Sequence, residues 1–154
     1  MGAALARIDA ELGGAPEGLD ALIVAERIKA QGGTALFIAR DYQRTGNFIQ
    51  AFRFFAKDVE VLEYPSWDCL PYDRLSPTAS VAAQRMATLT RLATRDPSDK
   101  TPLLVVATVA AAAQRTPPRS AVTGAGFAAK VGADLDTAAL ERYVAANGLS
   151  LIHI

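Results

Sequence analysis

The sequence predicts an α/β fold, a parallel sheet with flanking helices, and three observations lead to it. Short continuous apolar runs such as Thr34–Ala39 and Leu103–Ala107 are typical of strands that are covered on both faces. Longer segments with apolar residues at helical spacing lie between these runs. Because strand and helix patterns alternate along the chain, parallel strands joined by right-handed crossovers are favoured.

The first half of the chain shows clear start and stop signals. Gly32 and Gly33 end the first helical pattern, which is apolar around much of its circumference and is therefore expected to be buried between neighbours. Three prolines exclude helix and central strand from the segment after the second strand. The expected elements are a helix over Leu19–Gln31, a strand over Thr34–Ala39, a helix over Tyr42–Ala56, a strand over Val59–Glu63 and a loop over Tyr64–Pro77.

One aromatic side chain of the helix over Tyr42–Ala56 has no place in the predicted core. Three phenylalanines and one isoleucine form a single stripe, namely Phe48, Ile49, Phe52 and Phe55. Phe54 falls on the opposite, polar face. We therefore expect Phe54 to be exposed and available for a contact with another domain or partner.

The second half continues the alternation and then changes. Thr108 is expected to cap the short alanine-rich helix that ends before Pro117 and Pro118. After Ser120 the pattern indicates the start of a second α/β domain, and the abrupt apolar ending suggests a chain cut inside that domain. The expected elements are a helix over Ser80–Thr94 with Ala82, Met86, Leu89 and Ala93 on its apolar side, a turn over Asp96–Pro102, a strand over Leu103–Ala107, a strand over Phe127–Val131 and a helix over Thr137–Asn147.

Composition excludes several functional classes. The chain has 154 residues, 51% of them hydrophobic and 21% charged, which suits an ordinary globular domain. Lys plus Arg and Asp plus Glu both total 16, and a zero net charge disfavours a dedicated nucleic-acid or membrane-surface binder. One cysteine and one histidine cannot form a disulfide framework or an ordinary structural zinc site. With no membrane-length apolar run and no signal peptide, we expect a cytoplasmic protein.

A phosphate-binding loop is the first site to seek in such a fold. The glycine-rich turn before the first helix, Gly13 to Asp20, contains glycines but neither the Lys nor the Ser or Thr that this chemistry needs. Glu17 and Asp20 would also repel a triphosphate. We therefore interpret the segment as a turn into a helix, with no catalytic residue, no cofactor and no metal in this chain.

The sequence gives only weak evidence for other catalytic arrangements. Cys69 lies in the proline-rich loop, whereas His153 lies next to the end of the chain, and nothing brings the two together. Asp68 and Asp73 could form an acid–base pair, but loop carboxylates more commonly make turn hydrogen bonds or ion pairs.

A modest basic face is the remaining candidate for binding. Seven basic residues against two acidic ones lie between Arg74 and Arg119, and Arg91 and Arg95 are placed on the polar side of their helix. Together with Phe54, these two arginines are the candidate interface residues. The alternative is that the arginines form a solvated surface and the aromatics Tyr64, Trp67 and Tyr72 hold the loop against the sheet.

A loop-and-helix pattern resembles a known family. The loop runs Trp67-Asp-Cys-Leu-Pro-Tyr-Asp-Arg-Leu-Ser-Pro77, the next helix carries Arg85-Met-Ala-Thr-Leu89, and a buried run then leads to a short helix ending in Gln114-Arg115. This succession resembles the amino-terminal region of the bacterial transcription-repair coupling factor (Mfd) family, over about Gly13 to Gly148. The motif residues are Trp67, Leu70, Pro71, Tyr72, Asp73, Ser76, Pro77 and Arg85.

The resemblance implies a fold, a role and partners. It implies the module homologous to UvrB, with a RecA-like parallel sheet whose nucleotide site is degenerate. Its domains would be a helical extension over 1–12, a UvrB-like part over 13–119, and from 120 to 154 the start of the domain that contacts UvrA. The motor that uses ATP and magnesium, and the parts that bind RNA polymerase and DNA, would lie outside this chain.

Two further hypotheses concern the whole chain and one side chain. The main functional hypothesis is a non-catalytic interaction module, and the alternatives are a small helicase-like ATPase and a free-standing nucleic-acid binder. Arg85 falls on the same helix side as Leu89 and Leu92, where a guanidinium needs a partner. We expect it to hydrogen-bond Asp68 or Asp73, with Asp73 favoured, and so to hold the loop against the helix.

Overall fold

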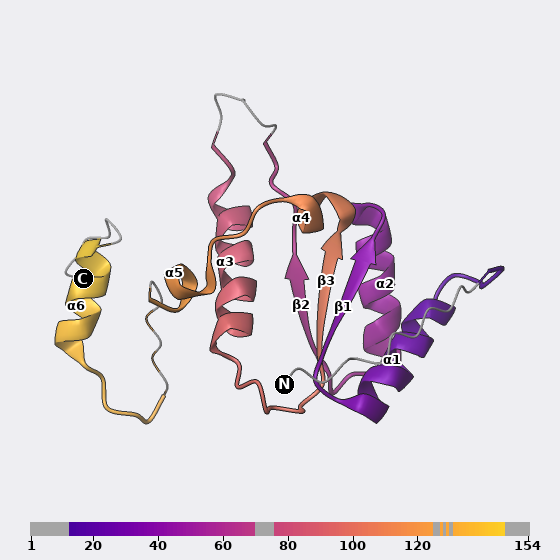
Figure 1. Ribbon diagram of the computed structural model, residues 1–154, viewed down its shortest axis with the longest axis horizontal. Coiled ribbons are helices and arrows are strands. Elements are labelled where there is room, and N and C mark those ends of the chain that lie inside the picture. The colour runs from indigo at the N-terminus through magenta and orange to yellow at the C-terminus, as the bar shows by residue number, and fades with distance from the viewer. Residues whose placement is uncertain (1–12, 70–75, 125–126, 128, 130, 147–154) are drawn as a thin grey trace, which may run out of the picture.

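The computed structural model describes residues 13–69, 76–124, 127, 129 and 131–146. Helices and strands alternate through most of this range, as the sequence predicted. The elements are α1 (Leu19–Gln31), β1 (Thr34–Ala39), α2 (Tyr42–Phe55), β2 (Glu60–Tyr64), α3 (Ala79–Thr94), β3 (Leu103–Thr108), α4 (Val109–Ala113), α5 (Arg119–Gly124) and α6 (Thr137–Ala146). The fold is therefore mixed α/β (Figure 1).

The three strands form one parallel sheet in the order β1-β3-β2. Thr34 pairs with Leu103 on one side of the central strand, and Glu60 pairs with Leu103 on the other side. Every residue of β3 is buried, whereas the two outer strands carry exposed positions. Parallel pairing requires a crossover after each strand, and α2 and α3 provide these connections.

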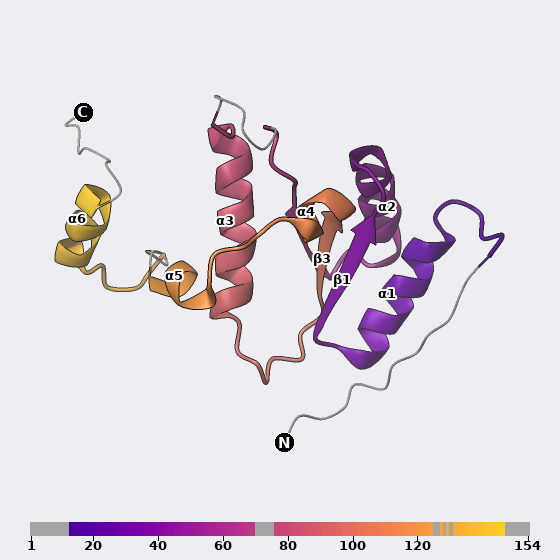
Figure 2. The ribbon, with the colours of Figure 1, turned by 45° about the horizontal axis from the view of Figure 1, so that its top comes forward.

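Helices α1 and α2 cover one face of the sheet (Figures 1 and 2). Three members of the predicted stripe of α2, Phe48, Ile49 and Phe52, are buried, whereas Phe55 is 37% exposed. Phe48 stacks on Phe37 of β1 with ring centroids 3.5 Å apart. The buried residues of this core are Ala21, Ala25, Ile28, Phe48, Ile49, Phe52, Ala56, Val59, Leu104 and Val106. The expectation that α1 is buried between neighbours is wrong, because it packs on α2 through one side only: Ala21, Ala25 and Ile28 are its buried residues, and Leu19 is 37% exposed.

The opposite face is covered by α3 and α4, but only in part. Its smaller core consists of Tyr64, Val105, Ala107 and Ala111, with Leu89 and Leu92 packed against them. These residues belong to β2, β3 and the two helices, and none belongs to β1. Leu36 and Ile38 of β1 are consequently 60% and 48% exposed. The expectation that this strand is covered on both faces is wrong, because α3 packs beside β2, at the side of the sheet away from β1 (Figure 1).

The buried side of α3 also differs from the prediction. Met86, placed on the apolar side, is 39% exposed, whereas Arg85 and Thr88 are buried. The hydroxyl of Thr88 donates to the carbonyl of Glu63 at 2.6 Å. Because α3 packs against β2, polar side chains that reach its backbone acceptors are buried in place of the flexible methionine.

Local signals at the ends of the elements are confirmed. Gly32 follows α1 with a positive φ of 65°, and a Cβ at this position would collide with the carbonyl of Lys100. Only glycine tolerates both the backbone conformation and this close approach. Thr108 caps α4 by accepting the Ala111 amide at 3.1 Å. The second strand begins and ends one residue later than expected.

The residues after Ser120 form two helices away from the sheet. α5 lies beside α3, and α6 lies beyond it (Figures 1 and 2). The strand expected over Phe127–Val131 is not found at the three described positions of that range, and 128 and 130 lie outside the described residues. Within the described part of the chain, no helix is long and apolar enough to cross a membrane.

Candidate functional site

The first strand-to-helix turn is where a parallel α/β sheet of this kind would hold a phosphate. Here that turn contains only Arg40 and Asp41, between the end of β1 and the start of α2. The Asp41 carboxylate accepts the amide of Arg44 at 2.8 Å and so caps α2. The position at which backbone amides would cradle an anion is thus filled by the chain's own carboxylate.

Asp41 is held in its charged form at this turn. The backbone amide of Arg44 and then the guanidinium of Arg40, 2.9 Å away, stabilise the carboxylate and lower the pKa of Asp41. A second anion placed here would meet this charge, and no lysine is available on the turn to offset it. In this fold the turn that would face a phosphate is therefore Arg40-Asp41, and not the glycine-rich turn from Gly13 to Asp20. Neither turn has the residues of a phosphate-binding loop.

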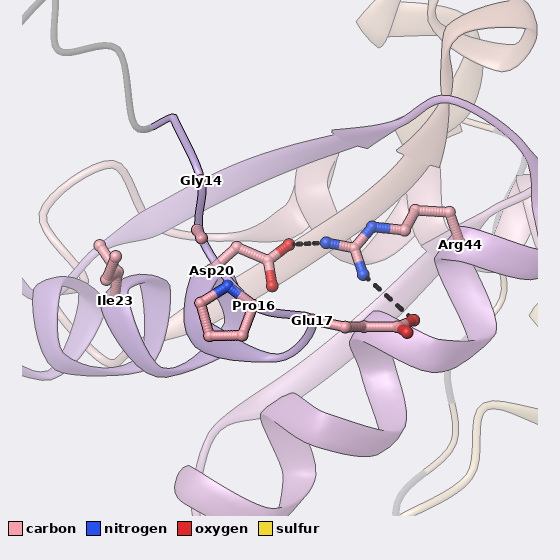
Figure 3. Close-up of a pocket in the computed structure, with 7 residues that line it drawn as sticks. Gly14, Pro16, Glu17, Asp20, Ile23 and Arg44 are labelled. Atoms are coloured by element: carbon pink, nitrogen blue, oxygen red, sulfur yellow. Dashed lines mark hydrogen bonds and ion pairs between the residues drawn. The ribbon is translucent and has the colours of Figure 1, made fainter.

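The glycine-rich turn does line a cavity of about 540 Å³ beside α2, and Figure 3 shows Arg44 reaching across it. Arg44 forms an ion pair with Asp20 and lies 3.6 Å from the carboxylate of Glu17. Asn47 donates to the same Glu17 carboxylate at 2.8 Å. The two acidic residues therefore tie the start of α1 to α2, and a phosphate would have to displace these contacts.

Arg85 is the centre of a buried polar cluster that joins β2, α3 and α4. It is 2% exposed, and its guanidinium carbon lies 4.2 Å from the ring centroids of both Tyr64 and Trp67. It donates to the Tyr64 hydroxyl at 2.6 Å and to the Pro65 carbonyl at 2.6 Å. Buried guanidinium groups require such partners, and the two aromatic rings add cation–π attraction.

Gln114 completes this cluster and was missed as a site residue in the sequence. Its side-chain oxygen accepts from Arg85 at 3.0 Å and from the backbone amide of Trp67 at 3.1 Å. Gln114 follows α4, so one side chain joins α3, α4 and the start of the loop after β2. The signal for it was present, because Gln114 belongs to the last part of the recognised pattern.

The predicted partner of Arg85 is corrected in one respect. Asp68 does not contact Arg85, because its carboxylate accepts the hydroxyl of Thr78 at 2.5 Å and the Thr78 amide at 3.1 Å. The Thr78 hydroxyl bond is the main cause of the lowered pKa of Asp68. Asp73, the favoured partner, lies outside the described residues. Arg85 does fasten the loop to α3, but through a carbonyl, an amide oxygen and two rings.

The other motif residues are less informative. Trp67 is half-buried against Arg85, Pro77 is half-buried, and Ser76 is exposed. Leu70, Pro71, Tyr72 and Asp73 lie outside the described residues, as does His153. Cys69 is a half-buried free thiol. Within the described ranges, no group of three or more metal-ligating side chains is found.

The three candidate interface residues have three different environments. Phe54 is 74% exposed, as predicted, and packs edge-on against Phe55. Arg91 forms a double hydrogen bond with Glu60, at 2.8 and 3.1 Å, and is half-buried. Arg95 is buried and donates to the carbonyl of Asp99 at 3.2 Å and to that of Thr101. Its placement on a solvated helix face is wrong, because it follows the last residue of α3 and turns into the adjoining loop.

The comparisons with known proteins add no family assignment. A scan against protein-family models and a search of curated proteins both give no match for this chain.

Proposed function

We propose that this chain is a non-catalytic interaction module of a bacterial transcription-repair coupling factor, acting in nucleotide excision repair. The observation that carries the proposal is the cluster around Arg85. Three separate parts of the pattern that resembles this family, the Trp67 loop, Arg85 and Gln114, meet at hydrogen-bond or ring-contact distance. A pattern whose parts depend on one another in space is better support for the resemblance than the same residues scattered over the surface.

The strand-to-helix turn supports the non-catalytic part of the proposal. Asp41 caps α2 at the point where a nucleotide phosphate would bind in a working domain of this class. The alternative of a small helicase-like ATPase is disfavoured by the same turn, which has two connecting residues and no lysine. The module would then act by contacts with other domains of a longer protein and with UvrA.

Nucleotide binding is the first test. Titration of the chain with a fluorescent ATP analogue and magnesium is expected to give no saturable signal at submillimolar concentrations, because Asp41 and the Glu17–Asp20–Arg44 contacts occupy both anion positions. A second titration with the Asp41→Asn variant removes the repelling charge and serves as the comparison. A micromolar dissociation constant for the unchanged chain would favour the ATPase alternative.

Direct binding to purified UvrA is the second test. The family resemblance places UvrA contacts in the domain that begins near residue 120, so we expect a labelled chain to gain fluorescence anisotropy when UvrA is added. The charge reversal Arg142→Glu on α6 should weaken this binding, and Arg53→Glu on α2 is the matched control, since both arginines are exposed. Equal loss in both variants, or no binding by the unchanged chain, would contradict the proposed partner.

A further inference from the structure

A second cavity lies at the other end of the sheet, where β1 and β3 begin. Its volume is about 330 Å³, and its lining comes from the start of β1, the end of α3, the loop after α3 and the start of α5. The lining residues are Gly33, Thr34, Leu92, Arg95, Asp96, Pro97, Asp99, Lys100 and Arg119. It shares no lining residue with the cavity beside α2. The proposed function does not use it.

Three cationic side chains line this cavity, and one of them, Arg95, is buried with an unpaired donor. The Arg95 side chain is only 7% exposed. Its Nη2 donates to two loop carbonyls and its Nε lies 3.4 Å from the Asp99 carboxylate, but Nη1 is buried and has no hydrogen-bond partner. A buried guanidinium N–H without an acceptor is costly, and few native proteins retain such a group without a reason.

The positive charges of the other two cations are not neutralised by a carboxylate among the described residues. Lys100 is exposed, and among the described residues its ammonium group forms no ion pair or hydrogen bond. Arg119 donates through Nε and Nη2 to the carbonyl of Ala93, at 3.0 and 2.6 Å, which fixes the direction of its guanidinium without neutralising it.

Two carboxylates also line the cavity and limit what it can bind. Asp99 accepts the Thr101 amide at 2.8 Å and pairs with Arg95, and Asp96 accepts the amide and hydroxyl of Ser98 at 2.8 and 2.7 Å. Both acids are therefore engaged inside their own loop. Three cations against two engaged carboxylates leave the lining with an excess of positive charge and an excess of donors.

We propose that this cavity is a binding site for a small oxyanion of the phosphate class, with Arg95, Lys100 and Arg119 as its ligands. The anion would accept from Arg95 Nη1 and pair with the ammonium of Lys100. Nη1 is covered in this structure, so binding requires a local rearrangement of the lining that brings Nη1 within reach of the anion. Tetrahedral oxyanions suit this arrangement, since they accept several hydrogen bonds from different directions.

The test is a titration of the isotopically labelled 154-residue chain with inorganic phosphate, followed by NMR, with sodium chloride adjusted to hold the ionic strength constant. We expect saturable shifts at the Gly33 and Lys100 amides and at Arg95 Nε, with a dissociation constant on the order of millimolar. The variant Lys100→Gln should weaken binding by about two- to fivefold, as one exposed charge would. Lys57→Gln, at another exposed lysine, is the matched control and should leave the affinity unchanged.

Two results would overturn the inference. One is a linear, unsaturated response equal in all three proteins, which would mean general screening of surface charge. The other is a saturable response that Lys100→Gln does not weaken, which would place the anion elsewhere. Both variants change exposed side chains, so thermal denaturation is expected to show them as stable as the unchanged chain.

Discussion

Arg85 shows how a charged residue can occupy a protein core when both terminal nitrogens of its guanidinium have acceptors and two aromatic rings lie against it. The guanidinium donates to the Tyr64 hydroxyl and the Pro65 carbonyl at the end of β2, and to the Gln114 side chain after α4. Loss of the side chain would remove one hydrogen bond from each of these acceptors, although Gln114 would keep the Trp67 amide, and would leave the two rings without the group between them. The residue therefore holds the loop after β2 against α3, and these contacts imply no catalytic role.

The first prediction concerns the contribution of Arg85 to stability. Arg85→Ala is expected to lower the free energy of unfolding by about 1 to 3 kcal/mol, the range for losing charged hydrogen bonds. Arg85→Lys keeps the charge but lacks the planar fork, so it should recover only a part of this loss. The control is Arg91→Ala on the same helix, which loses an exposed pair with Glu60 and should cost no more than about 1 kcal/mol. Urea denaturation measures all three, and equal costs for Arg85→Ala and Arg91→Ala would contradict the account.

Gly32 and Gly33 provide a second comparison at the scale of single residues. Both have positive φ, 65° and 82°, but only Gly32 has the Lys100 carbonyl where a Cβ would lie. Gly33→Ala should therefore cost only the backbone strain of about 1 to 2 kcal/mol. Gly32→Ala adds a collision with backbone and should be clearly more destabilising. Similar unfolding midpoints for the two variants would show that the loop moves away freely.

At the scale of elements, the sheet is asymmetric. β3 is buried along its whole length between two neighbours, whereas β1 has one neighbour and one open face. A leucine is therefore expected to contribute differently to the free energy of unfolding on these two adjacent strands. Leu104 of β3 is fully buried in the core with α1 and α2, and Leu36 of β1 is 60% exposed on the other face.

This asymmetry gives the third prediction. Leu104→Ala should destabilise the chain by about 2 to 5 kcal/mol, the range for buried leucines. Leu36→Ala removes an exposed side chain and is expected to change stability by no more than about 0.5 kcal/mol. Guanidinium denaturation of the two variants tests this directly. A large loss in Leu36→Ala would indicate that the open face is covered in solution, for example by a second copy of the chain.

At the scale of the whole molecule, ionised aspartates at turns and caps link stability to pH. Hydrogen bonds lower the pKa of five aspartates, mainly through a backbone amide in Asp41, Asp58 and Asp96 and a threonine side chain in Asp68 and Asp99. Each group binds its proton more weakly in the folded than in the unfolded chain. Their stabilisation is thus complete above the ordinary aspartate pKa of 3.8 and is lost as pH falls through the lower pKa values of the folded chain.

The fourth prediction follows from this loss of stability at low pH. The thermal unfolding midpoint should be steady near neutral pH and fall on acidification below about pH 4. Asp41→Asn retains a good helix cap without a titrating carboxylate, so its midpoint should match the unchanged chain at pH 7 and fall less steeply in acid. Ser76→Asn, an exposed polar substitution, is the control and should keep the full acid dependence. A rise in stability on acidification would contradict the assignment.

The sequence by itself determined the order of the elements from α1 to α4, the bounds of α1 to β3 to within one residue, the exposure of Phe54 and the caps at Gly32 and Thr108. These depend on local periodicity and on backbone preferences of a few residues, which neighbours in space do little to change. Only the tertiary structure decided that α3 buries Arg85 in place of Met86, that β1 keeps an open face and that Arg95 turns inward. The ion pairs of Arg44 with Glu17 and Asp20, and the hydrogen bond of Gln114 with Arg85, were likewise decided by the tertiary structure. Such outcomes depend on which element covers a face and which distant acceptor lies within reach, and a one-dimensional pattern does not contain that information.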